Sequence, residues 1–356
     1  MKTGYLVLEN GQVFKGQLFG AEKETMAELV FTTSMVGYLE ALTDPSYLGQ
    51  MVVQTFPLIG NYGVIPEDFE SEKPVLSAYI VREICQTPSN FRCQGKLEDY
   101  LKAQGIPGLC GVDTRALTKV LRREGIMNAA LVHQLPEDIQ EMQKKLQSLA
   151  APSGVEKVTC KQAYTYGEGK PVVLWDLGEK NSLHQELEAR GLKVTVVPAA
   201  TTCEEILSLK PDGVIISNGP GVPAATGKLA DQVAELMDTK VPVMGIGLGH
   251  QMMALAKGGK IIKLQWGHRG ANQPVKDLKN GKCFISSQNH GYAVSTRSLP
   301  EGGQVRMINI NDQTCEALEY TDGPCLSVQF HPQACGGPAD TRYLYDEFVN
   351  LMGGTK

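Results

Sequence analysis

Short apolar runs alternate with amphipathic helical patterns over the second half of the chain. The apolar runs are 172–175, 194–197, 213–217 and the one around Val243, and the helical stretches between them are 182–190, 203–209 and 226–237. Strands that are apolar on both faces are typical of a parallel sheet with helices on each side. Beyond residue 261 the pattern is less regular, with strand patterns at 283–287 and 326–330 and a closing helix at 341–352. The second half therefore predicts an α/β domain.

The first half combines strand patterns with later helical ones. Apolar runs flank Glu9-Asn10-Gly11, and because Asn and Gly tolerate positive φ this predicts a β-hairpin. Further strand patterns lie at 28–33, 51–55 and 75–81, and helical patterns lie at 96–104 and 114–124. Asp113 can cap the second of these helices, and Gly125 can end it. We expect a mixed α+β domain here.

A break in periodicity separates the two halves. A helical pattern at 137–149 is followed by Ala150-Ala151-Pro152-Ser153-Gly154, and periodicity stays poor until residue 169. We expect one domain at 1–152, a linker at 153–169 and a second domain at 170–356.

A glycine-rich turn follows the apolar run that ends at Met244. Helical spacing resumes at His250, so Gly245, Gly247 and Gly249 lie at a strand-to-helix turn. In a G-x-nucleophile-x-G elbow the middle residue presents its side chain above the sheet, beside the positive end of the next helix. Here the middle residue is Gly247, which has no side chain to attack with.

Four motifs resemble those of class I (triad) glutamine amidotransferases. They are Gly245-Ile246-Gly247-Leu248-Gly249-His250-Gln251, Ser217-Asn218-Gly219-Pro220-Gly221, Ser287-Gln288-Asn289-His290-Gly291-Tyr292 and Gln329-Phe330-His331-Pro332. The first half is similar to the amino-terminal domain of carbamoyl-phosphate synthetase small subunits in Met35-Val36-Gly37-Tyr38, Leu42-Thr43-Asp44-Pro45-Ser46-Tyr47, Pro57-Leu58-Ile59-Gly60-Asn61-Tyr62-Gly63 and Gly111-Val112-Asp113-Thr114-Arg115. The chain is identified as a member of that small-subunit family, in a variant that lacks the family's catalytic cysteine. The resemblance implies a mixed α+β domain followed by an amidotransferase domain with a largely parallel sheet flanked by helices.

The resemblance also assigns the catalytic positions. In the family a cysteine thiolate attacks the glutamine amide, a histidine carries the proton and a carboxylate orients the imidazolium. These roles fall on Gly247, His331 and Gln333. Glycine cannot form a thioester, and a neutral amide cannot offset the imidazolium charge, so we predict that glutaminase activity is lost. Val222 is a further departure, because the family usually has Asp there.

The glutamine pocket is expected to keep most of its residues. By resemblance, the binding positions are Ser46, Gly219, Gly221, Leu248, Gln251, Asn289, Gly291 and Tyr292. The backbone N–H groups of Leu248 and of the glycines are the expected oxyanion donors. Taken singly, each residue has a structural alternative, with the glycines as turn formers and His290 as a buried histidine with satisfied hydrogen bonds. Their joint order along the chain favours an ancestral glutamine site.

Three hypotheses for the function follow. The first is a small subunit that supports a large synthetase chain fed by free ammonia, in arginine or pyrimidine biosynthesis, with ATP and Mg²⁺ bound by the large chain and no cofactor on this one. The second is a non-catalytic glutamine sensor or scaffold. The third is an active glutaminase with an unexpected nucleophile, for which Cys335 is the nearest cysteine in sequence to His331. A dinucleotide site at Gly245-x-Gly247-x-Gly249 is disfavoured because His250 stands where the third glycine belongs.

Composition excludes several other classes. The net charge is −5 and the Lys and Arg residues are dispersed, which disfavours nucleic acid as a partner. Nine cysteines without a C-x-x-C pair predict reduced thiols and no metal site. No apolar stretch approaches the ~20 residues that span a bilayer, and no signal-peptide pattern opens the chain. We expect a cytoplasmic protein that does not bind a membrane.

Overall fold

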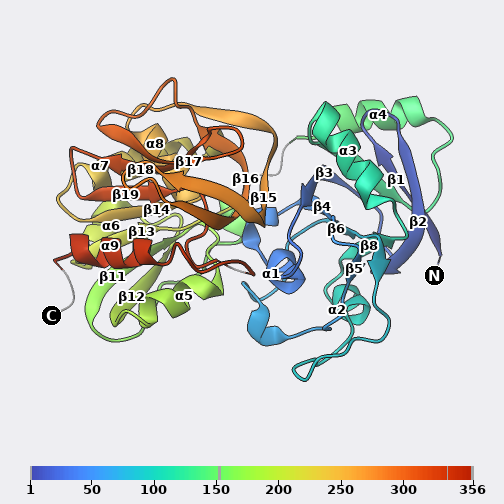
Figure 1. Cartoon of the computed structure of the whole chain (residues 1–356), viewed down its shortest axis with the longest axis horizontal. Helices are drawn as coiled ribbons and strands as arrows, with labels where there is room; N and C mark the ends of the chain where they lie inside the picture. The colour runs from blue at the N-terminus through green and yellow to red at the C-terminus, as the bar shows by residue number, and fades with distance from the viewer. Residues whose placement is uncertain (1, 151–153, 335, 354–356) are drawn as a thin grey trace. The chain divides into compact units, whose positions relative to one another are not determined.

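The computed structural model describes residues 2–150, 154–334 and 336–353, apart from the side chains of residues 225 and 226. The chain forms two compact units, Met1–Ser153 and Gly154–Lys356 (Figure 1). Within the expected linker, residues 154–169 carry a 3-10 turn, η3 (Val155–Lys157), and the short strand β10 (Tyr164–Tyr166), which pairs with the sheet of the second unit. Residues 151–153, part of the expected break, lie outside the described residues.

A closed barrel forms the centre of the first unit, with the strand order β1-β2-β8-β6-β4-β3-β9. Its strands are β1 (Thr3–Leu8), β2 (Val13–Gly20), β3 (Thr25–Thr32), β4 (Gln50–Gln54), β6 (Ala78–Ile80), β8 (Pro107–Cys110) and β9 (Met127–Val132). The predicted hairpin is confirmed, because β1 and β2 pair antiparallel around a turn in which Gly11 has φ 84°. β9 pairs with both β1 and β3 and so closes the barrel.

Among the described residues of this unit, four helices accompany the barrel: α1 (Tyr38–Leu42), α2 (Leu97–Ala103), α3 (Thr114–Glu124) and α4 (Ile139–Gln147). The shorter elements are η1 (Pro45–Tyr47), β5 (Leu58–Ile59), η2 (Pro66–Asp68) and β7 (Glu83–Ile84). The prediction for α3 is confirmed at both ends. The Asp113 carboxylate accepts a hydrogen bond from the Ala116 N–H at 2.9 Å, and Gly125 is the C-cap residue. Leu117 and Leu121 on this helix are buried.

The second unit contains a ten-stranded sheet in the order β10-β12-β11-β13-β14-β19-β18-β17-β15-β16. The strands after β10 are β11 (Lys170–Asp176), β12 (Leu192–Pro198), β13 (Gly213–Ile216), β14 (Val243–Ile246), β15 (Ile261–Asp277), β16 (Cys283–Val294), β17 (Gly303–Asn309), β18 (Cys315–Tyr320) and β19 (Cys325–Val328). The five strands β12, β11, β13, β14 and β19 are joined by parallel pairings. These are the strands that the apolar runs predicted.

Helices cover both faces of the parallel strands (Figure 1). They are α5 (Asn181–Glu188), α6 (Cys203–Ser208), α7 (Gly227–Met237), which the 3-10 turn η4 (Pro223–Thr226) precedes, α8 (Leu248–Ala256) and α9 (Tyr343–Leu351). Val173 and Trp175 of β11 pack with α6, α7 and α8, whereas Val172 and Leu174 pack with α5 and α9. The alternation buries β11 on both faces, and the predicted fold class is confirmed. None of the helices in the described part of the chain is long and apolar enough to cross a membrane.

The other part of the sheet is antiparallel, and the sequence pattern indicated it only weakly. β15 and β16 pair over most of their length, but the register shifts between Lys263 and His268 and again between Gly270 and Gln273. Each shift interrupts the period-two alternation that identifies a strand from sequence. For that reason only residues 283–287 of this antiparallel region were predicted as a strand.

Candidate active site

Three neighbouring parallel strands carry the predicted catalytic motifs to one edge of the sheet. β14 pairs in parallel with β13 on one side and with β19 on the other. Asn218 to Gly221 follow β13, Gly247 follows β14, and His331 follows β19. Because the carboxyl ends of parallel strands share an edge, the structure brings these three segments together.

The turn after β14 has the backbone geometry of a nucleophile elbow. Gly247 has φ 56° and ψ −107° and is the N-cap residue of α8. Its N–H donates to the Val328 carbonyl at 2.8 Å, which fixes the turn to the end of β19. A conformation with φ in this region is strained for a residue that carries a Cβ.

The flanking glycines are required by close packing. A Cβ at Gly245 would lie 2.5 Å from the Met253 sulfur, and one at Gly249 would lie 2.2 Å from the Ile216 carbonyl oxygen. At Gly247, in contrast, the nearest atom to a Cβ would be the Asn218 Cβ at 3.1 Å. The middle position therefore has nearly enough room for a side chain, and the protein has none there.

His331 and the predicted glutamine-binding segment are joined by backbone pairing. The His331 N–H donates to the Ser287 carbonyl at 2.9 Å, in an isolated antiparallel bridge. The Gln251 side-chain amide on α8 donates to the Tyr292 carbonyl at 2.9 Å and to the Gln329 side-chain oxygen at 2.9 Å. The β16 segment that contains Asn289, Gly291 and Tyr292 is thus tied both to the His331 segment and to α8. All four predicted motifs of this unit lie at one site.

The predicted triad-acid position, 333, carries a buried amide whose hydrogen-bond partner lies on α9. Gln333 is 1% exposed, and its side-chain oxygen accepts a hydrogen bond from the Tyr345 hydroxyl of α9 at 2.7 Å. Ala334 follows with φ 59°, and its N–H donates to the His331 carbonyl at 3.0 Å. The turn after β19 is therefore well fixed, but the side chain at position 333 carries no charge.

The remaining predicted residues are placed as follows. Gly219 packs against the Leu177 carbonyl, which a Cβ would approach to 2.2 Å, and Gly221 has φ 101°. Leu248 is the first residue of α8, where backbone N–H groups lack intrahelical acceptors. Ser46 lies in η1 of the first unit, where its N–H donates to the Asp44 carboxylate at 2.9 Å. Cys335 lies outside the described residues.

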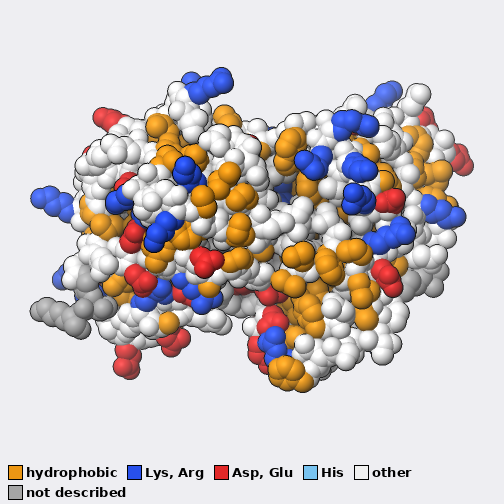
Figure 2. Space-filling model, viewed as in Figure 1, with side chains coloured by type: hydrophobic (Ala, Val, Ile, Leu, Met, Phe, Trp, Pro, Cys, Tyr) orange, Lys and Arg blue, Asp and Glu red, His pale blue; other side chains and the backbone are white. Residues whose placement is uncertain are grey.

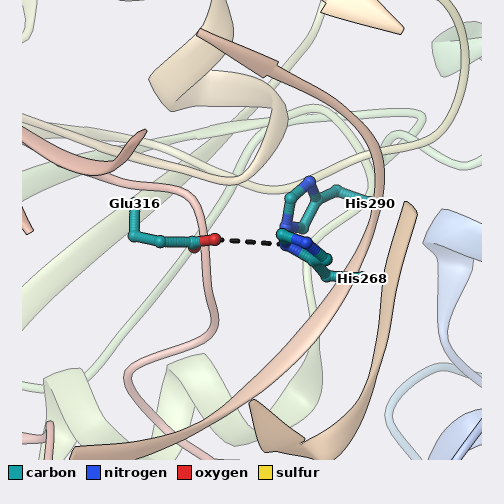
Figure 3. A group of neighbouring side chains, drawn as sticks. All are labelled: His268, His290 and Glu316. Carbon is teal, nitrogen blue, oxygen red and sulfur yellow. Dashed lines mark hydrogen bonds and ion pairs between the residues drawn. The ribbon is translucent and has the colours of Figure 1, made fainter. Parts of the chain in front are cut away.

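A buried polar network, which the sequence did not predict, supports the glutamine-binding segment. Figure 3 shows His268, His290 and Glu316 turned toward one another. The Glu316 carboxylate lies 3.2 Å from His268 Nδ1 and accepts at 3.0 Å from the Gln288 amide. The Gln288 side-chain oxygen lies 3.1 Å from His290 Nε2, and His290 Nδ1 lies 2.7 Å from the Tyr292 carbonyl. The network thus connects β15, β18 and the segment 288–292.

His268 supplies the charge balance of this network. Burial lowers its pKa, but hydrogen bonds to Asp312 at 2.8 Å and to Glu316 outweigh burial and raise the pKa to about 9. A buried imidazolium between two carboxylates offsets one of their two negative charges and so lowers the cost of burying them. Ligand atoms of His268, His290 and Glu316 lie within 4.8 Å of one another and could share a metal ion, but each already has a hydrogen-bond partner. A protonated His268 supplies a positive charge beside these carboxylates, as a bound metal ion would.

His250, inside the elbow motif, has a structural environment. It is fully buried, and its Nδ1 lies 2.7 Å from the Ser327 hydroxyl of β19. Burial lowers its pKa to about 3, so the ring is neutral at physiological pH. The His250 side chain therefore links the first turn of α8 to β19.

Comparisons with known proteins agree with this arrangement. The family described as carbamoyl-phosphate synthase small chain, CPSase domain, matches residues 6–131, and the family of class I glutamine amidotransferases matches residues 173–351. A carbamoyl phosphate synthase small chain of Clostridium perfringens is 47% identical over 345 residues, which are 97% of this chain and 98% of the relative. A carbamoyl phosphate synthase small chain of Fusobacterium nucleatum is 47% identical over 352 residues, which are 98% of this chain and 98% of the relative. One of Methanopyrus kandleri is 44% identical over 354 residues, which are 97% of this chain and 98% of the relative.

The fold, the arrangement of the motifs at one sheet edge and the sequence identity over nearly the full length of the chain all support the same family. We conclude that the chain belongs to the family of carbamoyl-phosphate synthase small chains, with an amino-terminal small-chain domain and a class I glutamine amidotransferase domain.

Proposed function

We propose that this chain is a carbamoyl-phosphate synthase small subunit that has lost glutamine hydrolysis and that supports a large synthetase chain fed by free ammonia. The observation that carries the proposal is Gly247 at the elbow, in the strained backbone conformation that normally presents the nucleophile. A side chain at position 247 would carry its attacking atom next to the loop after β13 and the amino terminus of α8. Glycine has no side chain and so supplies no attacking atom.

The other catalytic positions support the same conclusion. A base such as His331 contributes by taking a proton from the nucleophile and returning it to the leaving group. Without a thiol at position 247 there is no such proton to take. The imidazolium would also lack a carboxylate, because the Gln333 side chain is neutral and is hydrogen-bonded to Tyr345. Losing a triad nucleophile removes on the order of 10⁶ in rate.

The described cysteines of this unit are poor substitutes for the missing nucleophile. Burial raises the pKa of Cys203, Cys160, Cys315 and Cys325, to about 12 for Cys160 and Cys315 and to about 11 for Cys325. A thiol with so high a pKa contains almost no thiolate at neutral pH. Cys283 is exposed but begins β16, about 20 Å along the strand from Asn289.

The nitrogen source tests this proposal. The chain is reconstituted with its cognate large synthetase chain, and carbamoyl phosphate formation is measured with ATP, Mg²⁺ and bicarbonate, which the large chain binds. We expect formation with ammonium chloride and none above background with glutamine. The Gly247→Cys/Gln333→Glu double variant is expected to recover part of the glutamine-dependent rate. Glutamine use by the natural chain at the ammonium rate would contradict the proposal.

A second candidate is a glutamine sensor that binds without turnover. The observation that favours it is the intact support of the pocket, in which Gln251 holds the Tyr292 carbonyl and His331 pairs with Ser287. Calorimetric titration with glutamine distinguishes the two candidates. Saturable binding that Gln251→Ala weakens at least tenfold supports the sensor, and no binding at millimolar glutamine contradicts it.

A further inference from the structure

A cationic hollow on the first unit is lined by residues of that unit. It has a volume of about 560 Å³, and four of its lining side chains are Arg82, Arg115, Lys119 and Arg122. Hydroxyl groups line part of the wall, at Thr33, Thr55, Thr114 and Thr118. Figure 2 shows Lys and Arg side chains gathered on the face where α3 lies in Figure 1.

Three of the cations form a stripe along one helix. Arg115, Lys119 and Arg122 lie at positions i, i+4 and i+7 of α3, a spacing that places them on one face. Seven residues of α-helix extend about 10 Å. Arg82, which precedes β7, adds a fourth cation from a different part of the chain.

These charges are not neutralised within the described part of the chain. None of the four cations forms an ion pair with a described residue, whereas Arg123 on the same helix pairs with Glu124 and Lys145 on α4 pairs with Glu141. Asp113 is the acidic residue on the wall, and its carboxylate is used to cap α3. The whole chain is acidic, with a net charge of −5, so the cluster does not reflect a generally basic surface.

Arg115 and Lys119 also lie against the local electrostatics of α3, whereas Arg122 lies in the last turn, where the helix dipole favours a positive charge. Arg115 lies in the first turn of α3, where the helix dipole disfavours a positive charge. Like charges at i, i+4 on a helix, such as Arg115 and Lys119, repel each other. Side chains placed against local electrostatics in this way are typical of a binding surface.

We infer that this face of α3, with Arg82, docks a carboxylate-rich segment of the large synthetase chain. The inference rests on the proposed function, which supplies the partner. A stripe of about 10 Å is long enough to face several carboxylates along a segment. Arginine binds carboxylates with two parallel hydrogen bonds, and complementary charge at an interface mainly raises the association rate.

Charge reversal tests the inference. Binding of the full-length chain to its cognate large chain is measured by surface-immobilised kinetics at several salt concentrations. The Arg115→Glu/Lys119→Glu variant is expected to raise Kd at least tenfold, mostly through a slower association rate. It is also expected to flatten the dependence of Kd on salt. The matched control is Lys144→Glu on α4, another exposed lysine without a described ion pair, and its Kd should stay within twofold.

The outcomes separate the two proposals. Tight association of the natural chain that the double reversal leaves unchanged overturns this inference and leaves the proposed function in place. Failure of the natural chain to bind the large chain overturns both. The milder Arg115→Gln/Lys119→Gln variant guards against misfolding, because it should weaken binding without lowering the melting temperature. Titration with inorganic phosphate alone completes the test: phosphate binding lost in the reversal, with large-chain binding intact, assigns the hollow to a small anion and contradicts the inference.

Discussion

Gly247 combines the backbone geometry of a nucleophile elbow with an absent side chain. A residue with a Cβ pays on the order of 1–3 kcal/mol to adopt such a conformation, and glycine does not. The neighbouring glycines have a different physical reason, since Gly249 is in contact with the Ile216 carbonyl. At the scale of single residues, glycine thus makes this turn less costly to fold but offers no side-chain atom for a nucleophilic attack.

Substitutions at the glycines separate strain from steric overlap. Gly247→Cys is expected to lower the free energy of unfolding by about 1–3 kcal/mol, because of strain at φ 56° and the 3.1 Å approach to Asn218. Gly258→Ala is the control, since Gly258 has φ 76° with open space around its Cβ position, and we expect a loss of about 1–2 kcal/mol. Gly249→Ala should cost clearly more than either. Urea unfolding measures all three, and equal losses at Gly249 and Gly258 would contradict the packing argument.

Two histidines give the stability of the second unit opposite pH dependences. The pKa of His250 is lowered to about 3 from an ordinary 6.5, so its contribution is complete above pH 6.5 and is lost as pH falls toward 3. The pKa of His268 is raised to about 9, so its contribution is complete below pH 6.5 and is lost as pH rises through 9. Urea unfolding between pH 4 and 10 checks both directions. His250→Gln should flatten the acid side only and His268→Gln the alkaline side only; an unchanged acid side in His250→Gln would show that another group titrates there.

At the scale of elements, α9 fixes the segment after His331. Tyr345 lies on the face of α9 that packs against the sheet, and its hydroxyl holds the Gln333 amide. The site therefore depends on a helix at the end of the chain as well as on the strand edge. A carboxylate at position 333 could accept the same hydrogen bond and would place a negative charge in this turn.

Removing the Tyr345 hydroxyl tests this dependence. Tyr345→Phe is expected to destabilise the protein by about 1–3 kcal/mol, because the buried oxygen of Gln333 loses its partner. Tyr343→Phe on the same helix is the control, since that hydroxyl lies 3.4 Å from an Asp277 oxygen and is less buried. Thermal unfolding of both variants gives the comparison. A larger loss for Tyr343→Phe would refute the assigned role of Tyr345.

Elements with strong local signals could be predicted from sequence, and those that depend on distant pairing could not. α3 was predicted with its bounds because its cap, its apolar face and its terminal glycine all lie within a few residues. β8 was missed because Pro107–Cys110 is short, contains Pro and Gly, and is buried at every position, without alternation. The His268–Glu316 contact joins residues 48 positions apart, and no local spacing indicates it.

At the scale of the whole molecule, the motifs predicted which segments meet in the second unit better than the hydrophobic pattern predicted the fold of the first. The segments 217–221, 245–251, 287–292 and 329–332 meet as expected because the parallel order of β13, β14 and β19 brings strand ends together. The closed barrel of the first unit was not predicted, because barrel closure depends on β9 pairing with both β1 and β3. Roles that depend on chemistry, at Gly247, His331 and Gln333, remain predictions that require enzymology.

Ammonia release from glutamine is the most direct test of the central claim that this cleft lacks its nucleophile. The rate is measured for the natural chain in complex with its large chain and for the Gly247→Cys/Gln333→Glu variant of the same complex. The account predicts no release above the uncatalysed background from the natural chain and measurable release from the variant. Release by the natural chain at the rate of a cysteine-containing small chain, or a covalent glutamyl adduct in its intact mass, would contradict it.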